Sequence, residues 1–255
     1  MSNGNKLLQV KGLVKRFGGL TATDIGDFNV DSGELHAVIG PNGAGKTTFI
    51  SLLSGELQPD EGSIAFNGSE LTGIGVPQRA RLGLGRSYQI SQIFRDMTAL
   101  QNATMAVQAT ARHSFSFFKQ VATDEALVGP AREALELTGL GPRMSALTSE
   151  MAHGEHRQLE LAMTLATRPR LLLLDEPMAG MSRAESVEMI SLLKRIKTSY
   201  AVVLVEHDMD AVFTLADRVS VLVHGSVIAT GTPEEIRANP AVREAYLGDQ
   251  DMETM

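Results

Sequence analysis

The chain has 255 residues, of which 43% are hydrophobic, and it carries a net charge of −7. This length and composition suit one large domain, or two closely joined subdomains, with a sizeable core. The negative charge argues against a general nucleic-acid surface, because phosphate binding needs a clustered basic patch. The absence of cysteine excludes disulfides, thiolate metal sites and cysteine nucleophiles, and it fits a reducing compartment. Residues 1–5 do not resemble a signal peptide and no apolar run approaches the ~20 residues that span a bilayer, so we expect membrane association only through a partner.

The first third of the chain is predicted to contain short strands. Segments 7–14 and 22–30 are typical of the two strands of a hairpin. Between them, Phe17 precedes two glycines and has two interpretations: it stacks on a flat base at a surface pocket, or it fills the core of the hairpin. The residues alone favour the core. A second hairpin is predicted after the strand 63–66, since Asn67-Gly68 tolerates the positive φ of a tight turn.

Segment 40–48, Gly-Pro-Asn-Gly-Ala-Gly-Lys-Thr-Thr, is predicted to bind phosphate. It follows the apolar run 36–39, a predicted strand, and precedes 49–53, where apolar residues recur at helical spacing. In this context the glycines allow the main chain to approach a ligand, and converging N–H groups and a helix N-terminus attract an anion. We expect Lys46 to contact the β- and γ-phosphates and the Thr47 hydroxyl to bind Mg²⁺; an ordinary glycine-rich turn is the alternative. The other predicted phosphate-binding residues are Asn42, Gly43, Ala44, Gly45 and Thr48.

The middle third is predicted to be helical. A short helix at 77–82 and a brief strand at 84–88 lead into helices at 97–111, rich in Ala, Met and Gln, and at 126–137, closed by a glycine. The cluster Phe115, Phe117 and Phe118 indicates a loop or an interaction patch of unknown partner. Because this third has no clear strand, it is interpreted as a helical insertion within an α/β domain.

The last third alternates helices and strands. The continuous apolar run 171–174 is typical of a central parallel strand that is covered on both faces. Ser182 and Glu185 form a capping box, which predicts a helix reaching about residue 197. The remaining elements expected here are a helix at 156–167, a buried strand at 201–205, a hairpin of 219–223 with 227–229, a short helix opening at 232–235 and a polar tail from 249.

Three polar clusters directly follow predicted strands: the phosphate loop, Asp175-Glu176 and His207. Ligands bind at the carboxyl ends of parallel strands, so we expect these clusters to converge on one site. Asp175 is expected to support Mg²⁺ through water, Glu176 to orient or deprotonate the attacking water, and His207 to donate to the γ-phosphate. Gln89, at the end of the brief strand, is expected to meet Mg²⁺ and the attacking water. The alternatives are a solvated acidic pair and a polar strand cap, and the remaining histidines, His36, His113 and His224, are predicted to be structural or on the surface.

The ordered set of motifs resembles the ATP-binding subunit of ABC transporters over nearly the whole chain. The order is Phe17, the phosphate loop, Gln89, a signature-like segment 151–155, the acidic pair and His207. The resemblance implies a P-loop NTPase (RecA-like) α/β core with an N-terminal antiparallel β subdomain and a helical insertion subdomain. It implies an ATPase domain over 6–238, with the helical part at about 93–165, and a short tail over 239–255. It also implies ATP and Mg²⁺ as cofactors, and it reverses the interpretation of Phe17, which would stack on adenine.

Three local strings resemble a narrower group, the importers of branched-chain or other hydrophobic amino acids, which includes urea and amide importers of related build. These strings are 16–20, 205–209 and 239–248. The implied partners are a second ATP-binding subunit, two integral membrane permease subunits and, indirectly, a solute-binding protein. The two ATP-binding subunits would form a homodimer or, as the resemblance favours, a heterodimer. No nucleic acid is implied. The implied location is the cytoplasmic face of the inner membrane.

The signature-like segment departs from the family pattern Leu-Ser-Gly-Gly-Gln. Ala152 replaces the hydroxyl that would touch the γ-phosphate, while Gly154 keeps the backbone N–H groups at a helix start. Glu155 replaces Gln and is expected to point away from the nucleotide or to pair with Arg157. The segment 178–182 also lacks the usual Asp, so weakening of one nucleotide site is a hypothesis. The competing functions are a weakly hydrolysing regulatory subunit, a superfamily member acting on ribosomes or DNA, and an unrelated P-loop kinase.

Overall fold

A six-stranded sheet, in the order β10-β9-β3-β8-β7-β6, forms the centre of the fold. In the computed structural model, which describes residues 6–87, 93–110 and 124–245, all neighbouring strands of this sheet are parallel except the antiparallel pair β9–β10. The strands are β3 (Leu35–Ile39), β6 (Leu84–Arg86), β7 (Leu171–Asp175), β8 (Ala201–Val205), β9 (Arg218–Val223) and β10 (Ser226–Gly231). This is the predicted α/β core.

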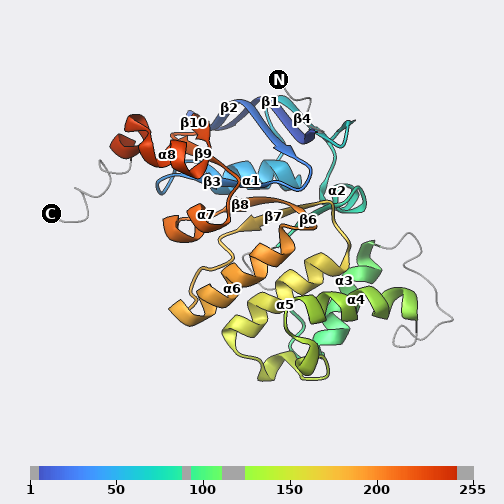
Figure 1. The fold of residues 1–255 in the computed structure, drawn as a ribbon. Coiled ribbons are helices and arrows are strands. Elements are labelled where there is room, and N and C mark those ends of the chain that lie inside the picture. The colour runs from blue at the N-terminus through green and yellow to red at the C-terminus, as the bar shows by residue number, and fades with distance from the viewer. Residues whose placement is uncertain (1–5, 88–92, 111–123, 246–255) are drawn as a thin grey trace.

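An antiparallel sheet in the order β2-β1-β4-β5 covers one side of the core (Figure 1). Its strands are β1 (Lys6–Phe17), β2 (Leu20–Asp31), β4 (Glu61–Phe66) and β5 (Ser69–Glu70). Both predicted hairpins are confirmed. The first one has longer strands than predicted, because β1 extends to Phe17 and β2 begins at Leu20. Asn67 and Gly68 adopt φ values of 48° and 77°, the left-handed conformation that their tight turn needs.

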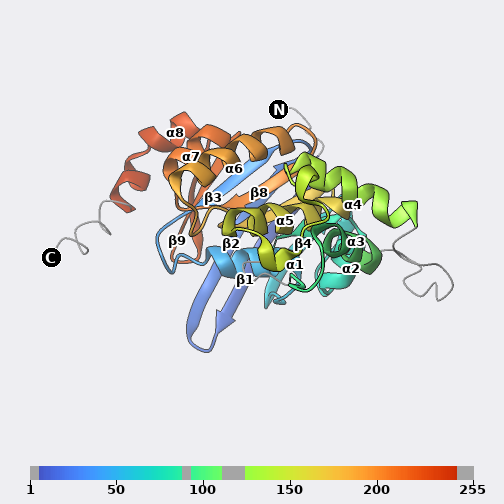
Figure 2. The same cartoon turned by 90° about the horizontal axis from the view of Figure 1, so that it is seen from below.

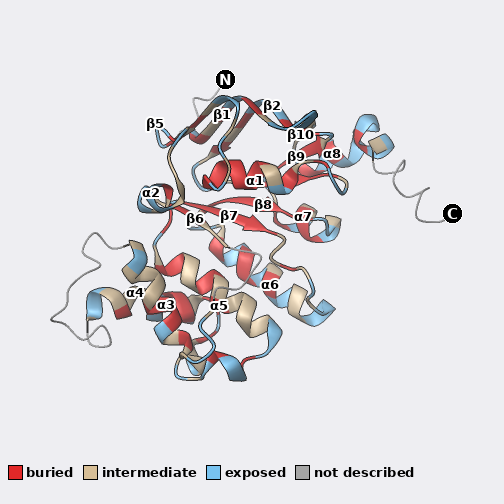
Figure 3. Ribbon diagram, turned by 180° about the vertical axis from the view of Figure 1, so that it is seen from behind, coloured by how far each residue is buried: buried red, intermediate tan, exposed pale blue. Residues whose placement is uncertain are grey.

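Helix α1 (Lys46–Ser54) lies between the two sheets, and its ribbon is mostly buried (Figure 3). Its side chains Phe49, Ile50, Leu52 and Leu53 belong to a buried cluster that both sheets share. The leucines of β7 alternate: Leu171 and Leu173 join this cluster, whereas Leu172 and Leu174 pack into the cluster on the opposite face. The apolar run is therefore covered on both faces, as predicted, since successive strand residues point to opposite sides.

Helices α3 (Ala99–Thr110), α4 (Glu125–Leu137) and α5 (His153–Ala166) pack together at the end of the molecule opposite the antiparallel sheet (Figures 1 and 2). Helix α6 (Arg183–Ile196) begins at Ser182, whose hydroxyl and Glu185 form the predicted capping box. The phenylalanine cluster of the sequence lies outside the described residues. The other helices are α2 (Val76–Arg81), α7 (Met209–Leu215) and α8 (Pro233–Ala238), with short 3₁₀ turns at Gly141–Arg143 and Thr148–Glu150.

Candidate functional site

The register of the parallel strands brings the predicted polar clusters to one edge of the sheet. Val38 in β3 is paired with Val205 in β8, which is paired in turn with Asp175 in β7. These three residues therefore lie at the same level along neighbouring strands. The phosphate loop starts two residues after Val38, and Glu206 directly follows Val205. The loop and Glu206 therefore both lie just beyond the edge of the sheet at which Asp175 ends β7.

The phosphate loop requires glycine where it enters α1. Gly45 has a φ of 100°, and a Cβ at this position would lie 2.3 Å from the Ala22 carbonyl oxygen. A side chain is thus excluded both by conformation and by the β2 backbone. The Gly225 N–H also donates to the Ala44 carbonyl at 2.9 Å, so the β9–β10 turn supports the loop as well.

Lys46 is buried at the start of α1, with its ammonium directed back to the loop. Its Nζ donates to the carbonyl oxygens of Gly40 at 2.6 Å and Pro41 at 3.0 Å. Burial lowers the pKa of Lys46, while the carboxylates of Glu176 and Asp175 act in the opposite direction. The lysine therefore lies within the electrostatic reach of both predicted acids.

Asp175 is the last residue of β7 and is 4% exposed. Burial raises its pKa, and the Arg86 guanidinium, whose Nη2 lies 3.6 Å from Oδ2, partly offsets this. Arg86 also binds Glu56 Oε2 at 2.6 Å and Ser54 Oγ at 2.7 Å, which fixes it beneath the acid. Oδ2 of Asp175 has no hydrogen-bond partner among the described residues. Arg86 could not be predicted as a site residue, because a polar residue inside a short strand belongs to no motif.

Glu176 and His207 approach each other from neighbouring turns. Glu176 adopts a φ of 48°, and its N–H donates to the Val205 carbonyl at 2.9 Å. The His207 Nδ1 lies 3.8 Å from Glu176 Oε1 and 3.8 Å from Glu206 Oε2, and its side chain is 64% exposed. The exposed imidazole and the carboxylate of Glu176 are thus close together at the sheet edge, as expected, whereas Glu206 was not identified as a site residue.

A cavity of about 420 Å³ joins the phosphate loop to the tip of the first hairpin. Phe17 lines it and is 48% exposed, so the interpretation of Phe17 as a plug of the hairpin core is wrong. Glu176 lines the same cavity, as do Asn42, Gly43, Ala44, Gly45, Lys46, Thr47 and Thr48. His224, predicted to be structural or on the surface, is exposed but also lines the cavity beside Gly225, a position that only the folded β9–β10 turn defines.

The signature-like residues lie elsewhere in the chain, at the N-terminus of α5. Ala152, Gly154 and Glu155 line a separate hollow with residues of α6 and are not part of the phosphate-loop cavity. Glu155 Oε1 accepts from Arg143 Nε at 3.0 Å and its Oε2 accepts from the Ala152 N–H at 2.8 Å. Of the two alternatives for Glu155, the pairing with Arg157 is wrong, because Arg157 pairs instead with Glu160, three residues along the same helix. Gly154 lies in the first turn of α5, as expected.

Gln89 and His113 lie outside the described residues, and His36 is buried and structural, as expected. Within the described ranges, no group of three or more His, Cys, Asp or Glu side chains is arranged to hold a metal ion. No helix in the same ranges has the length and apolar character needed to cross a bilayer.

Comparison with known proteins identifies the family. Residues 24–179 match the ABC transporter family model, and residues 226–251 match the model of the branched-chain amino acid ATP-binding cassette transporter. The chain is 37% identical over 250 residues to the high-affinity branched-chain amino acid transport ATP-binding protein BraF of Pseudomonas aeruginosa, covering 95% of this chain and 98% of BraF. It is 38% identical over 251 residues to LivG of Escherichia coli, which carries the same description, with the same coverage.

The fold is similar to that of a solved cassette. The structure of the ADP conformation of MJ1267, an ATP-binding cassette of an ABC transporter, matches with a TM-score of 0.84 and 27% identity, covering 95% of this chain and 99% of MJ1267. The sequence and fold similarities both extend over nearly the full length. The chain therefore belongs to the ABC transporter ATPases, within their branched-chain amino acid (LivG/BraF) type.

Proposed function

We propose that this chain is the ATP-hydrolysing subunit of an importer for branched-chain or other hydrophobic amino acids. The convergence of Lys46, Glu176 and Phe17 on one cavity is the observation that carries the proposal. The similarity to BraF and LivG supports the solute class, with urea or amides as the alternative solutes. The ATPase domain is proposed to extend over 6–238, with a helical part at about 93–165 and a tail over 239–255.

The cavity suits a nucleoside triphosphate. Phe17 presents an exposed ring on which adenine stacks, and the loop 42–48 supplies main-chain N–H groups and the helix N-terminus for the phosphates. The Lys46 ammonium would leave the carbonyl oxygens of Gly40 and Pro41 to contact the β- and γ-phosphates. The position of these residues around one continuous cavity supports the proposed roles.

The residues present fit Mg²⁺. Asp175 offers a buried carboxylate oxygen with no hydrogen-bond partner among the described residues, and Thr47 offers a hydroxyl at the start of α1. Two protein oxygens suit an ion that keeps several waters and binds substrate phosphates. When bound, Mg²⁺ neutralises charge on the β- and γ-phosphates.

Glu176 is the proposed base or water-orienting residue, and His207 is the proposed donor to the γ-phosphate. The separation of 3.8 Å between the His207 Nδ1 and Glu176 Oε1 leaves the imidazole free to adjust when a nucleotide binds. Gln89, which follows β6 in the chain, is proposed to meet Mg²⁺ and the attacking water.

A second ATP-binding subunit is proposed to complete the site. Ala152, Gly154 and Glu155 belong to the family signature but lie outside the cavity of their own chain, so they are available to the nucleotide of a partner. In such a sandwich the nucleotide contacts both subunits only when the dimer is closed, so ATP shifts the population towards closure. The absent hydroxyl at Ala152 favours unequal sites, and hence a heterodimer.

The permease subunits are proposed to dock on a groove beside the helical layer. A cavity of about 430 Å³ is lined mainly by apolar side chains of α2, β6, α3 and α5, among them Met105 and Met163, and by Ile93 and Phe94 from the segment before α3. Closure of the dimer would move this groove and so act on the membrane subunits. Docking there holds the chain at the cytoplasmic face of the inner membrane, with the solute-binding protein reached only through the permeases.

The complex of this chain with its co-purified membrane subunits is the material for the test. We expect Glu176→Gln to retain ATP binding and to lower the hydrolysis rate at least about 100-fold, because general-base removal typically costs this much. Glu136→Gln changes an exposed acid on α4, outside the cavity, and should hydrolyse ATP at the wild-type rate. Near-normal turnover of Glu176→Gln would remove Glu176 from its role. A wild-type complex that binds ATP without hydrolysis would favour the regulatory subunit.

A further inference from the structure

Glu206 is a buried acid that the proposed mechanism leaves without a role. It directly follows β8 and is 1% exposed. Burying a carboxylate is costly unless its oxygens are hydrogen-bonded. Burial raises the pKa of Glu206, and the N–H groups of Met178 and His207 act against this shift. An apolar side chain would avoid this cost, so the position of the carboxylate needs an explanation.

The two oxygens of Glu206 bind two different turns. The Met178 N–H donates to Oε1 at 3.1 Å, and the His207 N–H donates to Oε2 at 3.1 Å. Met178 lies two residues after Glu176, in the turn that continues from β7. Glu206 therefore connects the turn that follows the acidic pair with the turn that carries His207.

The surrounding backbone makes this connection rigid. The Glu176 N–H donates to the Val205 carbonyl at 2.9 Å, and the Ala179 N–H donates to the Glu176 carbonyl at 3.1 Å. On the other side, the Asp208 side chain caps α7 by accepting from the Ala211 N–H at 3.1 Å. The bond from Glu176 to Val205 thus joins the first turn to the residue before Glu206, and the Glu206 carboxylate adds one bond to each turn, which fixes their relative position further.

We propose that Glu206 is a positioning residue, which holds the turn of Glu176 against the turn of His207 so that both side chains reach the nucleotide together. This inference rests on the proposed hydrolytic function. The His207 Nδ1 lies at the same 3.8 Å from Glu206 Oε2 and from Glu176 Oε1, so the imidazole sits between the two acids. A displacement of about 1 Å between catalytic groups can cost about 100-fold in rate, which gives such a positioning residue a measurable effect.

The test uses the transporter complex with Glu206→Gln. Glutamine keeps the shape but offers one acceptor oxygen, so its amide N–H₂ faces one of the two backbone donors. We expect kcat to fall about 10- to 100-fold while KM for ATP stays within about 3-fold, since the phosphate loop is not altered. Glu34→Gln is the matched control, because Glu34 is a partly buried acid that likewise accepts hydrogen bonds, from Arg218 and the Asp31 N–H. Glu34 directly precedes β3, at the end of this strand that is opposite to the phosphate loop. This control should leave kcat unchanged.

A double variant separates positioning from general destabilisation. If Glu206 acts through Glu176, adding Glu206→Gln to Glu176→Gln lowers the residual single-turnover rate by no more than about 3-fold, because effects of residues that act as a unit are not additive. The proposal would be overturned if Glu206→Gln lowered the rate of the Glu176→Gln enzyme by the same factor as it lowers the rate of the wild type. So would an unchanged kcat in Glu206→Gln.

Hydrogen exchange tests the link without relying on hydrolysis. In Glu206→Gln, exchange in segments 176–181 and 206–211 should be about 10-fold faster, as expected for a lost hydrogen bond of ordinary strength. Unchanged exchange in both segments would refute the link itself. A wild-type complex that does not hydrolyse ATP, together with faster exchange in both segments of the variant, would instead refute the proposed function and leave the link standing.

Discussion

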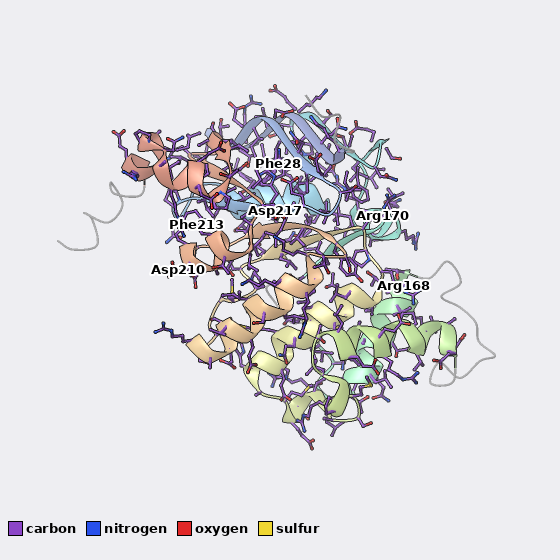
Figure 4. All side chains as sticks on the ribbon, viewed as in Figure 1. Phe28, Arg168, Arg170, Asp210, Phe213 and Asp217 are labelled. Atoms are coloured by element: carbon purple, nitrogen blue, oxygen red, sulfur yellow. The ribbon has the colours of Figure 1, made fainter. Side chains whose placement is uncertain are left out.

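His36 is predicted to make the protein less stable in mild acid. The ring is 1% exposed, and its centroid lies 4.4 Å from that of Phe28, a residue of β2 that is labelled in Figure 4. Its nitrogens are 3.0 Å from the Asn29 carbonyl oxygen and 2.8 Å from Ser220 Oγ. Burial, together with the nearby Arg218, lowers the pKa of His36 from 6.5 to about 3. The folded state therefore holds this imidazole neutral.

The sign and size of the effect follow from linkage. Because the folded pKa of His36 lies below the unfolded value, its stabilising contribution is complete above pH 6.5 and is lost as the pH falls towards 3. Between pH 7.5 and 5.0 the loss amounts to about 2 kcal/mol, and the full difference is about 5 kcal/mol once both states are protonated. The charged neighbours Glu34, 3.7 Å from Nδ1, and Arg218 are present in both wild type and variant, so a comparison isolates the histidine.

Urea unfolding at the two pH values measures this effect. The free energy of unfolding of the wild type should fall by about 2 kcal/mol more than that of His36→Gln, which cannot bind the proton. The control is His224→Gln, since His224 is exposed and its loss should leave the wild-type pH dependence intact. Equal pH dependence in wild type and His36→Gln would show that His36 is not held neutral by the fold.

Three further predictions concern other sites. Arg79 is buried and donates to four carbonyl oxygens around the end of α1. Arg79→Met should therefore lower the free energy of unfolding, measured in urea, by about 3 kcal/mol or more. Arg81→Ala, at an exposed position of the same helix, is the control and should lower it by about 0.5 kcal/mol or less. Gly45→Ala should weaken the binding of a fluorescent ATP analogue at least about 10-fold, because the new Cβ meets the β2 backbone and the φ of 100° is unfavourable; binding at wild-type strength would contradict the geometry of the loop. Phe17→Ala should weaken the same binding about 10-fold while Phe17→Tyr keeps it, since a stacked ring contributes about 1 kcal/mol beyond its buried area; equal affinities would remove the ring from the adenine site.

The fold and the phosphate loop could be predicted from the sequence because their determinants are local. The strand–glycine–helix order of residues 36–53 encodes a turn that few other sequences can form, and the continuous apolar run before Asp175 encodes a strand covered on both faces. The grouping of Asp175, Glu176 and His207 also followed, since parallel strands end at a common edge. These features depend on residue order and spacing, which the chain carries before it folds.

Side-chain partners could not be predicted in the same way. Arg143 binds Glu155 from a turn twelve residues away, whereas the nearer candidate Arg157 is taken by Glu160 one turn along its own helix. Similarly, Phe17 has the same neighbours in sequence whether it fills a core or lines a cavity. Its exposure follows from the way the first hairpin faces the phosphate loop, and this requires both sheets and α1 to be in place.

The sequence by itself therefore determined the family, the order of the elements and the edge of the sheet at which the phosphate loop, Asp175, Glu176 and His207 meet. Only the tertiary structure decided which residues support that edge: Arg86 beside Asp175, His224 beside the phosphate loop and Glu206 between the turns that carry Glu176 and His207. The physical reason is that these contacts join segments far apart in the chain: Met178 and Glu206 are 28 residues apart, Arg86 and Asp175 are 89 apart, and Ala44 and Gly225 are 181 apart. Local patterns of hydrophobicity and turn residues do not encode such distances.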